Sequence, residues 1–164
     1  MLMLKIKNLN ELGTTSIRKT ALKIVEAGLL AIDTSLIIEK KIRVDGDSVI
    51  IDGVPFRTSL KSKIYLVGIG KCSSEAAFAV ENILLDKLSG GIVLDVREPE
   101  KIGTRVKYYC GTHPFPSEKN TSITTEIVEF LKKLDENDLV IFIISGGGST
   151  LLCLPNEGNT CIEE

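Results

Sequence analysis

The sequence has little charge imbalance, a single histidine and no apolar run long enough to cross a membrane. Twenty Lys and Arg side chains balance twenty-two Asp and Glu across 164 residues, for a formal net charge of −2. This balance favours neither nucleic acid nor an anionic membrane, so any anion binding must be local. The opening Met1–Lys7 alternates with lysines and lacks the apolar core of a signal peptide. We therefore expect a cytoplasmic protein that binds neither nucleic acid nor membrane.

The cysteines follow no recognisable metal or disulfide pattern. No Cys-x-x-Cys pair is present, and His113 does not complete a zinc site with any cysteine at a familiar spacing. A chain of this size, 43% apolar, can build a core without disulfides. We expect reduced thiols and assign no metal ligands; the four cysteines are Cys72, Cys110, Cys153 and Cys161.

Apolar periodicity predicts one α/β domain. A helix capped by Thr15 or Ser16 runs to Ile32 with a packing face, and a β-hairpin turns at Asp45-Gly46-Asp47. Further on, strands alternate with helices, which indicates a Rossmann-like, mostly parallel sheet with helices on both faces. The expected strands are 64–67, 91–96, 105–109 and 139–144, and the expected helices are 73–88 and 118–134.

The apolar strand 139–144 leads directly into a glycine loop flanked by Ser145 and Ser149. Gly146, Gly147 and Gly148 have no Cβ to obstruct a ligand, so backbone N–H groups can converge on a phosphate or carboxylate. A following helix would add its positive end. A flexible turn is the simpler alternative for three glycines alone.

A second loop, Gly68-Ile-Gly70-Lys71, follows the first strand of the expected sheet. It is not a Walker-type P-loop, because Tyr65 stands where that motif needs glycine. A dinucleotide fingerprint fails at Ser73, although Asp95 ends the next strand where a ribose-binding acid could lie. Lys71 is placed to meet a phosphoryl group or a carboxylate, with an ordinary solvated lysine as the alternative.

The loop Thr112–Ser117 is stiffened by two prolines, Pro114 and Pro116, and holds the only histidine of the sequence. The prolines restrict the backbone and hold His113 extended. Histidine can carry a proton or bind a substrate oxygen, and it can also be purely structural. Ser117 is placed to cap the helix that follows.

These three motifs in this order resemble the glycerate 2-kinases of the large two-domain type, some of which have been labelled hydroxypyruvate reductases. The resemblance covers roughly residues 14–157. It departs from the family's usual pattern at Cys72, Ser117 and Thr150, none of which removes a ligand-bearing group. The matching segments are Gly68-Ile-Gly70-Lys71, His113-Pro-Phe-Pro116, and Ser145-Gly-Gly-Gly-Ser149 followed by Leu151-Leu152 and Pro155.

The resemblance implies transfer of the γ-phosphoryl group of ATP to the 2-hydroxyl of D-glycerate, assisted by Mg²⁺, to give 2-phosphoglycerate. Phosphoryl transfer asks a protein chiefly for positioning and positive charge. Lys71 would be the catalytic residue that neutralises charge. The residues expected to bind substrate or phosphate are Gly68, Gly70, His113, Ser145, Gly146, Gly147, Gly148 and Ser149.

Members of this family are much longer than this chain. The resemblance therefore implies that residues 1–164 are an incomplete N-terminal domain that lacks a C-terminal domain and is inactive alone. Exposed apolar surface would then favour self-association, for example as a homodimer. Two alternatives stay open: an NAD(P)H-dependent hydroxypyruvate reductase, from the near-fingerprint at Gly68, and a non-catalytic sugar-acid binding remnant.

Overall fold

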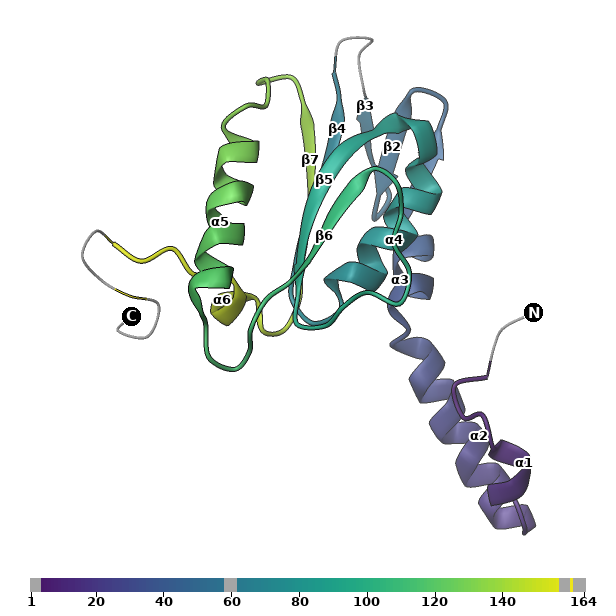
Figure 1. Cartoon of the computed structure of the whole chain (residues 1–164). Helices are drawn as coiled ribbons and strands as arrows, with labels where there is room; N and C mark the ends of the chain where they lie inside the picture. The colour runs from purple at the N-terminus through teal and green to yellow at the C-terminus, as the bar shows by residue number, and fades with distance from the viewer. Residues whose placement is uncertain (1–3, 58–61, 157–159, 161–164) are drawn as a thin grey trace.

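The computed structural model describes residues 4–57, 62–156 and 160 (Figure 1). Its centre is a four-stranded parallel sheet with the strand order β6-β5-β4-β7. Helices cover both faces of this sheet, which confirms the predicted fold class. The four strands are β4 (Ile64–Ile69), β5 (Leu88–Asp95), β6 (Val106–Cys110) and β7 (Leu139–Ile144).

The order of the strands reverses beside β4. From β4 the chain passes through helix α4 (Ser73–Leu84) to β5 and then to β6, moving in one direction across the sheet. Helix α5 (Glu118–Leu131) then returns it to β7, which pairs with the other side of β4. In open parallel sheets, the crevice at such a reversal, beyond the carboxyl ends of the strands, is the usual ligand site.

Two cores flank the parallel sheet. On one face, α4 packs with a second, antiparallel sheet formed by the N-terminal part of the chain. On the other, α5 and the short α6 (Gly148–Leu151) cover the strands (Figure 1). Fully buried side chains anchor both layers, among them Leu66, Ala77, Val80 and Val93 on the α4 side and Val67, Leu94 and Leu151 on the α5 side.

The predicted β-hairpin is present and has a third strand that the sequence analysis did not anticipate. Strands β1 (Ile42–Asp45) and β2 (Ser48–Ile51) pair antiparallel, and β3 (Val54–Arg57) pairs with β2. All three strands have only four residues, so their period-two pattern is short. Two further helices, α1 (Leu9–Leu12) and α3 (Thr34–Lys41), were also not predicted.

The predicted N-terminal helix is α2 (Ser16–Ala31), capped as expected by the Thr15 hydroxyl, which accepts from the Arg18 N–H at 3.3 Å. Its expected packing role is not found within the described residues. Ile17, Ile24 and Ile32 are 82%, 69% and 71% exposed, and α2 projects away from the sheets (Figure 1). Apolar spacing therefore predicted the helix correctly but not a partner for its apolar face.

Several predicted boundaries shift by a few residues, most of all the end of α4. Helix α4 ends at Leu84, because Leu85 adopts a positive φ of 50° and opens the 3₁₀ turn η1 (Leu85–Lys87). Strand β5 therefore begins at Leu88 rather than residue 91, and α5 ends at Leu131 rather than Leu134. In the described part of the chain, no helix is both long and apolar enough to cross a membrane.

Candidate functional site

The two glycine loops lie side by side at the strand reversal, beyond the carboxyl ends of β4 and β7. Their backbones are joined directly. The Ser145 N–H donates to the Ile69 carbonyl at 2.9 Å, and the Lys71 N–H donates to the Gly146 carbonyl at 3.0 Å. The Ser145 hydroxyl also accepts from the Cys72 N–H at 3.3 Å. The parallel pairing of β4 with β7 thus brings two loops 75 positions apart in sequence into one structure.

Gly70 lets the two loops approach each other. Its φ of +123° is unfavourable for any residue with a side chain. A β-carbon there would lie 2.2 Å from Ser145 Oγ and 2.6 Å from the Ser145 carbonyl oxygen. Both constraints require glycine, so Gly70 holds the loop pair together.

Gly147 is the point at which the three sequence motifs meet. A β-carbon built on Gly147 would lie 3.2 Å from Lys71 Cε, 3.3 Å from His113 Cδ2 and 3.4 Å from His113 Nε2. Lys71, from the first loop, and His113, from the loop with two prolines, therefore both contact the glycine loop. A primary amine, an imidazole and glycine backbone are thus gathered around one small volume, although they come from three separate parts of the chain.

The two loops differ in their available backbone donors. In the first loop, the N–H groups of Gly70, Lys71, Cys72 and Ser73 all donate within the protein. In the second, no described residue accepts from the N–H of Gly146 or Gly147. Ser149 lies in the first turn of α6, where helix N–H groups lack intrahelical acceptors. The second loop therefore presents the donors that an anion needs, while the first loop positions Lys71.

Asn120 anchors the histidine loop, a role that the sequence analysis missed. The buried side chain accepts from the Thr112 N–H at 2.9 Å and donates to the Thr112 carbonyl at 3.1 Å. It also donates to the Leu151 carbonyl at 3.3 Å, at the end of α6. One amide thus ties the residue before His113 to the helix that follows the glycine loop. An asparagine in the first turn of a helix carries no sequence signal for this role.

The remaining predicted site residues have definite places. Gly68 is buried within β4, and a β-carbon there would lie 3.0 Å from Val93 Cγ2. Gly148 begins α6 and is buried, whereas Ser149 is exposed. The predicted phosphate-binding roles of these residues stay predictions. Ser117 is the N-cap residue of α5, but its hydroxyl pairs with Thr112 instead of a helix N–H.

Asp95, the residue that the sequence suggested as a ribose-binding acid, is the last residue of β5, and its carboxylate lies at the start of α4. Asp95 is 3% exposed, and its carboxylate accepts from the Ser74 N–H at 2.9 Å and the Val96 N–H at 2.6 Å. Ser73, in the position of the third fingerprint glycine, donates its hydroxyl to the Gly70 carbonyl at 2.7 Å. A carboxylate at this helix start occupies the place where a dinucleotide pyrophosphate would lie, which disfavours that binding mode.

The described residues show no cluster of side chains suited to metal binding or to thiol chemistry. Within residues 4–57 and 62–156, no cluster of three or more His, Cys, Asp and Glu side chains could hold a metal ion. Cys72 and Cys110 are free thiols, Cys153 is buried, and Cys161 lies outside the described residues. Burial and then Glu98 raise the pKa of Cys110, which disfavours a reactive thiolate.

The fold and the loop pair define an α/β protein in which two glycine loops meet at the strand reversal of a parallel sheet. Residues 20–164 match the family described as Domain of unknown function (DUF4147). The chain belongs to that family. It is 34% identical over 142 residues to a glycerate 2-kinase of Pyrococcus horikoshii, covering 87% of this chain and 31% of the relative.

Solved structures agree with this assignment. A protein of Pyrococcus horikoshii superimposes with a TM-score of 0.78 at 33% identity, over 90% of this chain and 33% of its own. A glycerate kinase of Thermotoga maritima gives 0.71 at 27% identity, over 89% and 32%. Two relatives from Agrobacterium vitis are named putative hydroxypyruvate reductase.

The chain spans about a third of the length of the relatives that it matches. The predicted resemblance to glycerate 2-kinases is confirmed, and the relatives' names support glycerate kinase activity at the family level.

Proposed function

We propose that this chain supplies the phosphate-binding part of a kinase that transfers the γ-phosphoryl group of ATP to the 2-hydroxyl of D-glycerate. The convergence of Lys71 and His113 on Gly147, both within 3.4 Å of the position that a β-carbon on this glycine would occupy, carries this proposal. Relatives named glycerate 2-kinase support the substrate and the position of transfer. The product would be 2-phosphoglycerate.

Each residue around Gly147 has a distinct proposed role. The Lys71 ammonium neutralises charge on the transferring phosphoryl group or on the glycerate carboxylate. The Gly146 and Gly147 N–H groups, with Gly148 and the hydroxyls of Ser145 and Ser149, bind phosphate or carboxylate oxygens. His113 contacts the substrate, and Gly68 and Gly70 complete the loop that presents Lys71. Mg²⁺ carried by the nucleotide phosphates would supply the remaining positive charge.

Exposed apolar surfaces support a further proposal, that the active kinase includes additional polypeptide. The edge strand β7 exposes Phe142 and Ile144 at 51% and 74%, and α2 exposes its apolar face. Exposed apolar side chains on a sheet edge and on a helix face are typical of interfaces. We propose that a C-terminal domain or a second copy of the chain, as a homodimer, covers these surfaces, and that the assembly works in the cytoplasm. The isolated chain would then bind ligands without turnover.

A chimera tests the proposed activity. Residues 20–164 would replace the matching segment of the Pyrococcus horikoshii glycerate 2-kinase, and ³¹P NMR would follow Mg-ATP and D-glycerate with time. We expect 2-phosphoglycerate from this chimera. Lys71→Met in the same chimera should lower kcat/KM by roughly 30- to 1,000-fold, equivalent to about 2 to 4 kcal/mol of transition-state stabilisation.

Two controls make the result decisive. Lys63→Met changes an exposed lysine that lies before β4, away from the loop pair, and should leave the rate unchanged. Circular dichroism would establish that every chimera is folded. A folded chimera that makes 2-phosphoglycerate equally fast with Lys71→Met would remove the proposed role of Lys71. Exclusive formation of 3-phosphoglycerate would contradict the proposed site of transfer.

The hydroxypyruvate reductase alternative rests on the names of two relatives and on the near-fingerprint at Gly68. The position of Asp95 at the α4 start disfavours it. Consumption of NADH with hydroxypyruvate by the folded chimera, without any phosphorylation of D-glycerate, would reverse the ranking. Ligand binding without turnover in either assay would favour the non-catalytic sugar-acid binding alternative.

A further inference from the structure

A cleft of about 750 Å³ opens beside α4, next to the loop pair. Its size falls in the range of small-molecule sites. Lys71 and Cys72 line the end nearest the glycine loop, and Phe78, Ala79 and Ile83 on α4 line its wall. Because a helix rises about 1.5 Å per residue, the side chains from Ser74 to Ile83 extend the cleft about 14 Å away from Lys71. No role has yet been given to this space.

One polar group in the cleft has no partner. The Ser74 side chain is 6% exposed and lines the cleft, and its Oγ forms no hydrogen bond with any described residue. Buried hydroxyls in native proteins are normally paired, so an unpaired one indicates an absent ligand or water. Beside it, Asp95 Oδ2 accepts from the Ser74 N–H and from the Ser73 hydroxyl, whereas Oδ1 accepts one backbone N–H, from Val96, and keeps capacity for a second donor. The hydroxyl and the carboxylate together suit a ligand with neighbouring hydroxyl groups.

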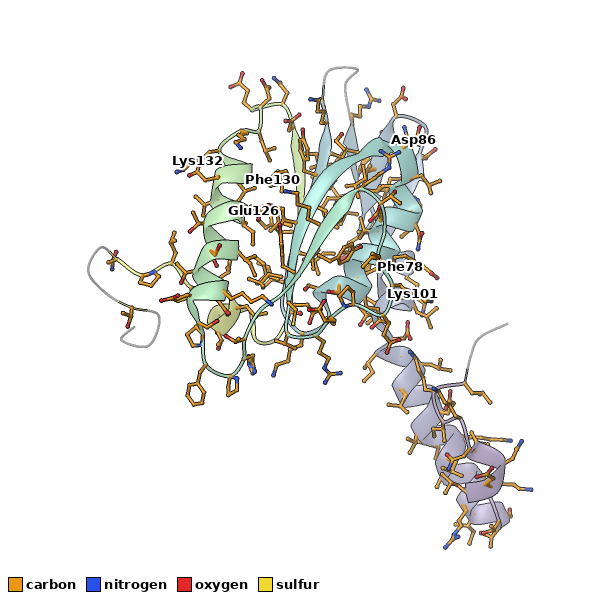
Figure 2. The ribbon with its side chains drawn as sticks, viewed as in Figure 1. Phe78, Asp86, Lys101, Glu126, Phe130 and Lys132 are labelled. Carbon is orange, nitrogen blue, oxygen red and sulfur yellow. The ribbon has the colours of Figure 1, made fainter. Side chains whose placement is uncertain are left out.

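The charge distribution favours a neutral group in the cleft. Away from Lys71, acids such as Glu75, Glu98 and Glu100 counter the basic Arg97 and Lys101. Lys101 lies over the Phe78 ring with its Nζ 5.8 Å from the centroid (Figure 2), and both side chains line the cleft. An extended polyanion would be repelled here, whereas a planar, uncharged base could contact Phe78.

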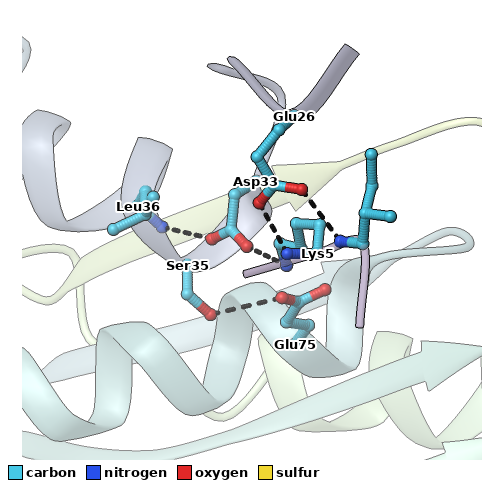
Figure 3. Close-up of polar contacts among 7 residues, drawn as sticks. Lys5, Glu26, Asp33, Ser35, Leu36 and Glu75 are labelled. Carbon is cyan, nitrogen blue, oxygen red and sulfur yellow. Dashed lines mark hydrogen bonds and ion pairs between the residues drawn. The ribbon is translucent and has the colours of Figure 1, made fainter. Parts of the chain in front are cut away.

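Part of the cleft wall is held by a polar network from the N-terminal segment. Lys5 pairs with Asp33, and the Ser35 hydroxyl donates to Glu75 Oε1 at 3.4 Å (Figure 3). The Lys5 and Ile6 N–H groups donate to the buried Glu26 at 2.7 and 2.8 Å. Lys5, Ser35 and Glu75 line the cleft, so the network defines this side of it.

We propose that this cleft is the nucleoside subsite of the phosphate donor. The adenine ring lies along Phe78 and Ile83, the ribose hydroxyls bond with Ser74 Oγ and Asp95, and the phosphates extend past Lys71 to the glycine loop. This inference rests on the proposed kinase function, which supplies a nucleotide as the donor. It adds the location of the nucleoside, which neither the glycine loop nor its contacts with Lys71 and His113 specify.

Adenosine itself is the direct probe, because it has no phosphate. An ¹H–¹⁵N NMR titration of the 164-residue chain with adenosine should shift the amides of Ser74, Phe78 and Asp95, leaving Gly146 and Gly147 unmoved. Phe78→Ala should weaken adenosine binding about tenfold. Phe142→Ala, on the distant edge strand, is the matched control and should leave binding unchanged.

Ser74→Ala separates a ligand-binding hydroxyl from a structural one. Because Ser74 Oγ is unpartnered, we expect the variant to keep or raise thermal stability while adenosine binding falls several-fold. Ser122→Ala, on an exposed position of α5, should change neither. A loss of stability in Ser74→Ala without a change in adenosine affinity would show that the hydroxyl is structural and overturn its proposed role.

The outcomes distinguish this inference from the proposed function. The chimera could phosphorylate D-glycerate, or the chain bind nucleotide, while adenosine either fails to bind saturably or shifts amides outside the cleft. That result would overturn the nucleoside subsite and leave the kinase proposal standing. Adenosine binding in the cleft by a chain whose chimera phosphorylates nothing would support the subsite alone. If D-glycerate, and not adenosine, shifted Ser74 and Phe78, the cleft would be a substrate site and the inference would be wrong.

Discussion

Replacing Gly70 with alanine tests whether close contact between the two loops builds the site. The new β-carbon would lie 2.2 Å from Ser145 Oγ, 2.6 Å from its carbonyl oxygen and 2.7 Å from its carbonyl carbon. The hydroxyl can rotate away, but the backbone atoms can yield only if the loops separate. Overpacking of this kind costs about 1 to 3 kcal/mol, and the +123° φ adds about 1 to 3 kcal/mol.

We therefore expect Gly70→Ala to lower the free energy of unfolding by about 2 to 6 kcal/mol, measured by urea denaturation. Gly146→Ala is the matched control, because a β-carbon there meets no atom within 4 Å. It should change stability by less than about 1 kcal/mol. Equal stabilities for Gly70→Ala and Gly146→Ala would refute the tight junction between the loops. A folded Gly70→Ala protein should also lose phosphate affinity, because Lys71 would move away from Gly147.

Three further results are expected. Asn120→Ala should destabilise the chain by about 2 to 4 kcal/mol and shift the NMR signals of His113, since backbone groups of Thr112 and the buried Leu151 carbonyl would lose their partner; unchanged His113 signals would contradict the anchoring role. The hydrogen bond from Lys5 lowers the pKa of Asp33 in the folded state. The ionised carboxylate therefore stabilises the fold above its unfolded pKa of about 3.9, and this stabilisation is lost as the pH falls through the lower pKa of the folded state. Thermal melts from about pH 5 to 2 should therefore be less pH-dependent in Asp33→Asn, and equal slopes would refute the pairing. Sedimentation should show concentration-dependent association of the wild type that Ile24→Lys abolishes, and a monomeric wild type at high concentration would contradict an α2 interface.

Sequence pattern predicted the parallel sheet well because its strands are apolar and end in glycine-rich turns. The three motifs around Lys71, His113 and Gly147 could also be identified, since each combines glycine or proline with a chemically distinctive residue. Their meeting at Gly147 depends on β7 pairing with β4, and strand order is set by tertiary packing that short motifs do not encode.

Other features had weaker signals. Asn120 and Ser74 have common residue types at ordinary helix positions, and their importance comes from burial and from partners distant in sequence. The exposed face of α2 shows the opposite problem. Its apolar periodicity indicates that the face is buried somewhere, but periodicity cannot say whether the partner lies in the same chain.

The most direct test of the central claim is an NMR titration of the chain with tripolyphosphate, a probe that carries no nucleoside. The loop pair should bind it saturably, with the largest amide shifts at Gly146, Gly147 and Ser149 and smaller shifts at Lys71 and His113. Lys71→Met should weaken that binding about tenfold or more, since one phosphate contact loses its charge. Saturable binding with shifts confined to other parts of the chain, or equal affinity in Lys71→Met, would contradict a phosphate site at this loop pair.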